Sequence, residues 1–146
     1  MRLKKLYTYS NNRQLWRILP NDTGKIIIEE RDPQNKQVYF NCIDIRTGKP
    51  LFSNFQLDEK YWIGIEAVTG ELILFHKFVK PDLPAHLGII VFDIKTRTVL
   101  WETYDYNFLF LRGEKIYSFR SGFEGKEYFV LDLFTGELLE SLGDNS

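Results

Sequence analysis

One eleven-residue motif occurs three times in this chain, and it constrains the fold more than any other feature. The copies read CIDIRTGKPLF (Cys42–Phe52), VFDIKTRTVLW (Val91–Trp101) and VLDLFTGELLE (Val130–Glu140). In each copy an apolar run ends with an aspartate and resumes after a short polar turn. The aspartates, Asp44, Asp93 and Asp132, are 49 and then 39 residues apart. Periods of this size indicate a repeat architecture, in which each repeat is one supersecondary unit that packs on its neighbours.

The repeated polar positions suit a tight connection between strands. An aspartate carboxylate accepts hydrogen bonds from backbone N–H groups two or three residues ahead, and a threonine hydroxyl does the same further along the turn. Glycine then adopts the left-handed conformation. We expect this structural role for Asp44, Thr47, Gly48, Asp93, Thr96, Asp132, Thr135 and Gly136. Arg97 occupies the glycine position of the second copy. The second turn therefore either has another geometry or holds Arg97 in the left-handed backbone conformation, at a cost of about 1–2 kcal/mol.

Short segments between turn signals are alternating or continuously apolar, which predicts four strands in each repeat (15–57, 61–106 and 108–142). The predicted strands are Leu15–Leu19, Lys25–Arg31, Val38–Ile45, Pro50–Leu57, Tyr61–Val68, Glu71–Phe78, Gly88–Ile94, Thr98–Tyr106, Phe108–Arg112, Lys115–Arg120, Glu127–Leu133 and Glu137–Leu142. No window of 11 residues shows a helical apolar period, so we expect little helix.

Four antiparallel strands repeated at this spacing are typical of β-propeller blades. The sequence therefore predicts an all-β protein of antiparallel four-stranded blades, three blades of a β-propeller-like fold (a partial propeller), in one domain over residues 1–146. We expect Phe52 and Trp101, on the fourth strands of their repeats, to be large apolar plugs between blades. Glu140 takes this position in the third repeat, either because no further blade of the same kind follows or because the motif has decayed.

The pattern D-x-x-T-G-x-x-x-W, with a small or apolar residue two before the aspartate, resembles the blade motif of quinoprotein-type (PQQ-like) propellers. The matching positions are Cys42, Asp44, Thr47, Gly48 and Phe52, then Val91, Asp93, Thr96 and Trp101, then Val130, Asp132, Thr135 and Gly136. The run LWRILP…EERD…WIGIEAV…PDLPAHLGIIVFD is also similar to an uncharacterised bacterial family, a domain of unknown function, which implies no activity. The PQQ enzymes use a complete ring, and many have vicinal cysteines. This chain has three repeats and one cysteine, so we expect no cofactor.

The charge and the cysteine content limit which kinds of partner and which cellular compartment we expect. With 19 basic and 20 acidic residues the formal net charge is −1, so no global field favours nucleic acid or an anionic membrane. The basic residues before Asn21 (Arg2, Lys4, Lys5, Arg13 and Arg17) form either a solvated arm or a contact for phosphate or an acidic partner. The single Cys42 has no intramolecular disulfide partner, and no apolar segment resembles a signal or a membrane span. We therefore predict a cytoplasmic protein that does not contact membranes.

One loop holds both histidines of the chain. The stretch HKFVKPDLPAHLG (His76–Gly88) is longer than a hairpin needs and accounts for the longer second period. The candidates for a ligand site are Trp62, Glu66, His76 and His86. The alternative is a structural loop braced by Pro81 and Pro84. Since two histidines alone are too few ligands for a metal, we predict no metal site and no catalytic residue.

Other acidic and aromatic residues have structural explanations. Glu29 and Glu30 alternate across a strand, so we expect one solvated and one hydrogen-bonded carboxylate instead of an acid/base pair. We expect the aromatic side chains between Tyr104 and Phe110 to share a strand face in the core. The chain has no phosphate-binding loop, nucleophile elbow or H-E-x-x-H helix, which disfavours an enzyme without excluding one.

Three blades are too few to close a propeller, which typically has four to eight. We therefore expect a noncatalytic scaffold for protein–protein interaction, whose partner is another protein or a second copy that completes a six-bladed ring. The alternative is a small-ligand-binding protein or an enzyme, with a site near His76 and His86 or at the mouth of the completed ring. Nucleic-acid binding through the basic arm is the weakest of the hypotheses.

Overall fold

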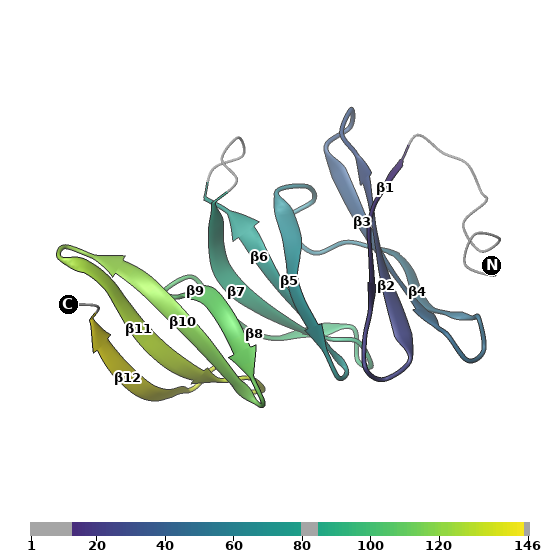
Figure 1. Ribbon diagram of the computed structural model, residues 1–146. Coiled ribbons are helices and arrows are strands. Elements are labelled where there is room, and N and C mark those ends of the chain that lie inside the picture. Colours follow the sequence, from purple (N-terminus) through teal and green to yellow (C-terminus); the bar gives the residue numbers. More distant parts are fainter. Residues whose placement is uncertain (1–12, 80–84, 145–146) are drawn as a thin grey trace. The chain divides into compact units, whose positions relative to one another are not determined.

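A computed structural model describes residues 13–79 and 85–144, and this part of the chain is built from strands (Figure 1). The strands are β1 (Gln14–Pro20), β2 (Lys25–Asp32), β3 (Gln37–Asp44), β4 (Pro50–Phe55), β5 (Ile63–Thr69), β6 (Leu72–Phe78), β7 (His86–Asp93), β8 (Thr98–Thr103), β9 (Asn107–Arg112), β10 (Lys115–Gly122), β11 (Gly125–Asp132) and β12 (Leu138–Asp144). They form three four-stranded sheets, each in chain order. The predicted all-β fold of antiparallel four-stranded blades is confirmed. Within the described ranges no helix is long and apolar enough to cross a membrane.

The chain divides into two compact units. The first extends to Ile63 and includes Val68–Gly70, whereas the second comprises Gly64–Ala67 and the chain from Glu71 onward. Sheet β1–β4 lies in the first unit, and sheet β9–β12 with most of sheet β5–β8 lies in the second. That the chain is a single domain stays a prediction.

The core of the first unit lies around its two central strands. β2 pairs with β3 in an unbroken antiparallel register that places Ile27 opposite Cys42. Both of these side chains, together with Ile28, Val38 and Phe40, are fully buried. Cys42 is therefore the small core residue that its position in an apolar strand predicts.

The core of the second unit joins its two sheets. Leu72, Leu74, Ile89 and Val91 come from β6 and β7, and Ile116, Leu131 and Leu133 come from β10, β11 and the turn after β11. We call these seven residues the second-unit core. Because β-branched and leucine side chains from both sheets interdigitate here, each sheet buries one face on the other.

The three motif turns are formed as the sequence predicts. In each turn the backbone N–H at the glycine position donates to the carbonyl of the aspartate: Gly48 to Asp44 (2.8 Å), Arg97 to Asp93 (2.8 Å) and Gly136 to Asp132 (2.9 Å). The aspartate carboxylates accept from the backbone N–H two residues ahead, at Arg46, Lys95 and Phe134. Arg97 has φ 58°, so this turn keeps the common geometry and forces an arginine into the left-handed region.

Trp101 behaves as the predicted plug between consecutive sheets of the second unit. Its Nε1–H donates to the backbone carbonyl of Leu133 (2.9 Å), and its ring covers Gly136 so closely that a Cβ there would lie 2.5 Å from it. The aromatic side chain of one repeat thus packs on the motif turn of the next. Glu140, at the same motif position, is exposed.

Two expectations about side-chain environment are wrong. Glu29 and Glu30 are both buried, so neither is the solvated member of the pair: Glu29 pairs with Arg31, two residues along the same strand, and Glu30 pairs with the distant Arg13. The aromatic residues Tyr104 to Phe110 do not share one strand, since a bend separates β8 from β9. Tyr106 and Phe108 pack on the second-unit core, whereas Tyr104 and Phe110 are exposed.

Candidate functional site

Three of the four candidate site residues lie on adjacent strands of one sheet. Glu66 lies on β5, His76 on β6 and His86 at the first position of β7. The order of this sheet is β5-β6-β7-β8, so the hydrogen-bonded ladder places the three side chains next to one another. We call them the Glu66–His76–His86 cluster, and all three belong to the second unit.

A β-bulge shapes the backbone beside the cluster. The pairing of β6 with β7 shifts register between Phe75 and Lys77, and Gly88 on the bulged strand has φ 79°. A side chain at Gly88 is excluded, because its Cβ would lie 2.8 Å from the carbonyl oxygen of Thr103. The Gly88 N–H is fixed by the side-chain oxygen of Asn107 (2.9 Å). Glycine is therefore required where β7 leads into the cluster.

The cluster atoms lie within bonding range of one another. Oε2 of Glu66 is 2.9 Å from Nδ1 of His86 and 3.6 Å from Nε2 of His76. The two imidazole rings stack with centroids 3.5 Å apart and planes 11° apart. Phe78 contacts His76 edge-on, which closes one side of the stack. The side chain of His76 is 4% exposed and that of Glu66 is 12% exposed, whereas that of His86 is 48% exposed.

The tautomer of His76 follows from its backbone partner. Nδ1 of His76 lies 3.1 Å from the carbonyl oxygen of Lys77, which can only accept a hydrogen bond. Nδ1 therefore carries the hydrogen, and the Nε2 lone pair of the neutral ring points toward Glu66. A nitrogen lone pair and a carboxylate oxygen that face each other attract a proton or a metal cation between them.

The described contacts of Trp62, the fourth candidate, are with other residues. It belongs to the first unit, where its ring packs edge-on against Tyr61 (centroids 4.8 Å apart) and lies 5.5 Å from Nζ of Lys36. The proposed loop braces Pro81 and Pro84 lie outside the described residues.

The part of the basic arm that the structure describes has internal partners. Nη1 of Arg13 lies 3.2 Å from Oε1 of Glu30, and the guanidinium carbon lies 3.6 Å from the ring centroid of Tyr39. Asn41 donates a second hydrogen bond to Glu30 (3.1 Å), which accounts for the burial of this carboxylate. Arg2, Lys4 and Lys5 lie outside the described residues. These contacts support a structural role for Arg13 better than a role as an open contact for phosphate.

The first unit contains a buried ion pair that was not predicted from the sequence. Nε of Arg31 donates to Oε2 of Glu29 (2.7 Å), and its Nη groups donate to the carbonyl oxygens of Tyr61 and Ile63. Burial raises the pKa of Glu29, and the charge and hydrogen bond of Arg31 partly oppose this shift. The i,i+2 spacing of Glu29 and Arg31 on one strand face was the available signal, but the carbonyl partners are 30 residues or more away in sequence.

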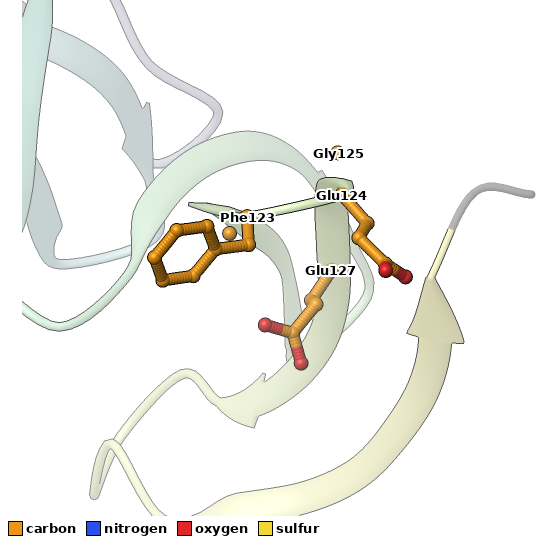
Figure 2. Close-up of a pocket in the computed structure, with 5 residues that line it drawn as sticks. Phe123, Glu124, Gly125 and Glu127 are labelled. Atoms are coloured by element: carbon orange, nitrogen blue, oxygen red, sulfur yellow. The ribbon is translucent and has the colours of Figure 1, made fainter.

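A surface hollow at the β10–β11 turn has no such organisation. It is lined by Gly122, Phe123, Glu124, Gly125 and Glu127. Figure 2 shows that the ring of Phe123 and the carboxylate of Glu124 project to opposite sides of the turn. Phe123 is fully exposed, and one hairpin, β10–β11, supplies every lining residue, so this hollow has no polar groups that converge from different elements.

A family model described as a domain of unknown function, DUF4905, matches residues 19–101. The chain belongs to this family. The DUF4905 match includes Glu66, His76 and His86, so the cluster lies within the family region. No curated protein matches the chain.

A solved structure described as "KlHsv2 with loop 6CD replaced by a Gly-Ser linker" is similar in fold. It has 15% sequence identity and a TM-score of 0.50, and the alignment covers 90% of this chain and 40% of that one. This DUF4905 chain thus spans less than half the length of the structure that it matches. The likeness shows the fold alone, and the quinoprotein-type repeat stays a prediction.

Proposed function

We propose that this DUF4905 protein is a noncatalytic interaction module and that its sheet β9–β12 binds a second copy of the chain. The observation that carries the proposal is an apolar, partly exposed sheet face in the second unit. The partly exposed residues of this outer face are Phe110, Tyr117, Phe119 and Tyr128, whereas Val130 on the same face is buried. Apolar patches of this kind are typical of protein-binding surfaces.

The strand pairing defines the outer face. Tyr117 lies opposite Phe110 on β9 and opposite Val130 on β11, and directly opposed residues project to the same side of a sheet. Ile116, the preceding residue on β10, projects to the other side and is fully buried in the second-unit core. The rings of Phe110 and Tyr117 stack with centroids 4.6 Å apart and planes 9° apart, and Phe110 remains 45% exposed.

A second copy of the chain is the occupant that the observations favour. In the second unit, sheets of this type already bury apolar faces on one another. The apolar outer face is therefore suited to pack on a sheet of a second copy. A formal net charge of −1 also gives little repulsion between copies. In this proposal two chains supply six sheets, which falls within the four to eight of closed propellers and fits the quinoprotein-type motif. The proposed compartment is the cytosol.

The test is the solution mass of the chain by light scattering over a dilution series. We expect a dimer whose dissociation is strongly promoted by Phe110→Lys, because a charge would be buried at the interface. Ile45→Lys is the matched control, since Ile45 is 51% exposed in a turn of the first unit and is not one of the residues of the outer face. A monomeric wild-type chain, or equal effects of both substitutions with unchanged circular dichroism, would rule the proposal out.

Ligand binding at the Glu66–His76–His86 cluster is the second candidate function. It is favoured by the convergence of two imidazoles and a carboxylate within one sheet.

A further inference from the structure

We infer that Glu66, His76 and His86 form a binding site for a divalent transition-metal ion of the Zn²⁺ type, with one coordination position open to solvent. The inference is independent of self-association through the outer face of sheet β9–β12. It revises the expectation, drawn from two histidines alone, that the chain has no metal site.

The ligand atoms have the right kind and spacing. One atom from each side chain, two imidazole nitrogens and one carboxylate oxygen, lie within 4.8 Å of one another. With Zn²⁺ bonds of about 2.0–2.1 Å, neighbouring ligand atoms of a tetrahedron lie about 3.3–3.4 Å apart. The observed separations of 2.9 and 3.6 Å from Glu66 Oε2 bracket this value.

His76 is already oriented as a ligand. Metal-binding histidines commonly donate their other ring N–H to a backbone carbonyl, which fixes the tautomer and the ring orientation. The hydrogen bond from Nδ1 of His76 to the carbonyl of Lys77 has this form and directs Nε2 toward the cluster. His86 faces Glu66 through Nδ1 instead, so the two histidines bind through different ring nitrogens.

The three side chains differ in exposure, and an accessible metal site needs both buried and exposed ligands. Glu66 and His76 are held among strands with little exposed area, and they form the fixed inner half of the site. The side chain of His86 is 48% exposed and forms the outer half, through which an ion and a water molecule reach the cluster. Two parallel stacked rings cannot both aim in-plane lone pairs at one ion. We therefore expect the exposed ring of His86 to rotate out of the stack when metal binds.

The donor set selects the class of metal. Imidazole nitrogen suits Zn²⁺ and its first-row neighbours, whereas Ca²⁺ and Mg²⁺ prefer sites built only from oxygen. Two histidines and one carboxylate leave a tetrahedral ion with a fourth position for water or an exogenous ligand. The carboxylate of Glu66 also offsets part of the ion's charge in a largely buried place.

Calorimetric titration of the tag-free full-length chain with ZnCl₂ tests the site, with MgCl₂ as the ion that should not bind. We expect one Zn²⁺ per chain, and a loss of affinity of at least about tenfold in both His86→Ala and Glu66→Gln. Glu114→Gln is the matched control, because Glu114 is exposed in the β9–β10 turn. Since the chain has only two histidines, His86→Ala leaves one imidazole and avoids the buried His76, whose loss could unfold the second unit.

A second readout separates this site from adventitious surface binding. In ¹⁵N spectra of the imidazoles, Zn²⁺ should shift Nε2 of His76 and Nδ1 of His86, and should leave Nδ1 of His76 bound to hydrogen. Absence of Zn²⁺ binding, unchanged affinity in His86→Ala, or a shift of the opposite nitrogens would overturn the inference.

Discussion

At the scale of single residues, the motif turns show that different residue types adopt the same left-handed backbone conformation. Gly48 and Gly136 have φ 69° and 75°, and Arg97 adopts φ 58° at the equivalent position. A β-carbon is disfavoured in this region because it approaches the following carbonyl. The turn is therefore imposed by the aspartate and the strand pairing around it, and Arg97 is strained to fit.

Replacing this arginine should stabilise the protein. Arg97→Gly relieves about 1–2 kcal/mol of backbone strain and loses about 0.5–1 kcal/mol through the greater freedom of glycine in the unfolded chain. We expect a net gain of about 0.5–1 kcal/mol in the free energy of unfolding, measured in urea. Lys95→Gly, in the same turn but without a positive φ, should be destabilising. A loss of stability in Arg97→Gly would contradict this account.

The buried Glu29 should make stability depend on pH in an unusual direction. Burial raises its pKa in the folded protein above the ordinary value of 4.5, so the folded state holds this proton to higher pH than the unfolded state does. Its contribution is therefore most favourable below about pH 4.5 and declines as the pH rises toward the folded pKa.

Glu29→Gln removes this ionisation and keeps an oxygen that can accept from Arg31. The free energy of unfolding of the wild type relative to Glu29→Gln should fall as the pH rises above about 4.5 in parallel urea titrations. A difference that grows with pH would show that the ion pair with Arg31 outweighs burial.

At the scale of elements, the contact between Trp101 and Gly136 couples two consecutive sheets. The indole of β8 donates to the Leu133 carbonyl and occupies the space beside the next motif turn. Both ends of this contact are motif positions, the aromatic residue from the second copy of the motif and the glycine from the third.

Gly136→Ala should cost more than the same change at a glycine with open space around it. Gly113 has φ 61° and nothing within 4 Å of a built Cβ, so Gly113→Ala should cost only about 1–2 kcal/mol of backbone strain. At Gly136 the Cβ would also meet the Trp101 ring at 2.5 Å, which adds about 1–3 kcal/mol of overpacking. Thermal unfolding followed by tryptophan fluorescence measures both, and equal losses would exclude a role for the indole contact.

At the scale of the whole molecule, the number of cooperative units is the open prediction. The sequence predicts one domain, and the structure divides into two compact units. Ile27 lies in the core of the first unit and Leu131 in that of the second, and both are fully buried.

If the chain is one domain, it should unfold in a single transition. Ile27→Ala and Leu131→Ala should then each lower the free energy of unfolding by about 2–5 kcal/mol. Differential scanning calorimetry distinguishes this result from the alternative. Two transitions, of which each substitution moves only one, would show that the units fold independently.

The twelve strands, their antiparallel order and the three motif turns were predictable from the amino-acid sequence, because they depend on neighbours within a few residues. The aspartate that caps each turn and the alternation of apolar residues are local demands, and the same solution recurs in each repeat.

Only the tertiary structure decided which distant side chains meet. The sequence nominated Glu66, His76 and His86, but the order of strands β5, β6 and β7 and the bulge at Gly88 bring their polar atoms together, and Trp62 is left in the other unit. Glu30 is buried because Arg13, 17 residues away in sequence, reaches it, which strand periodicity cannot show. Local hydrogen bonds specify strands and turns, whereas burial and ligand geometry depend on contacts between residues far apart in the chain.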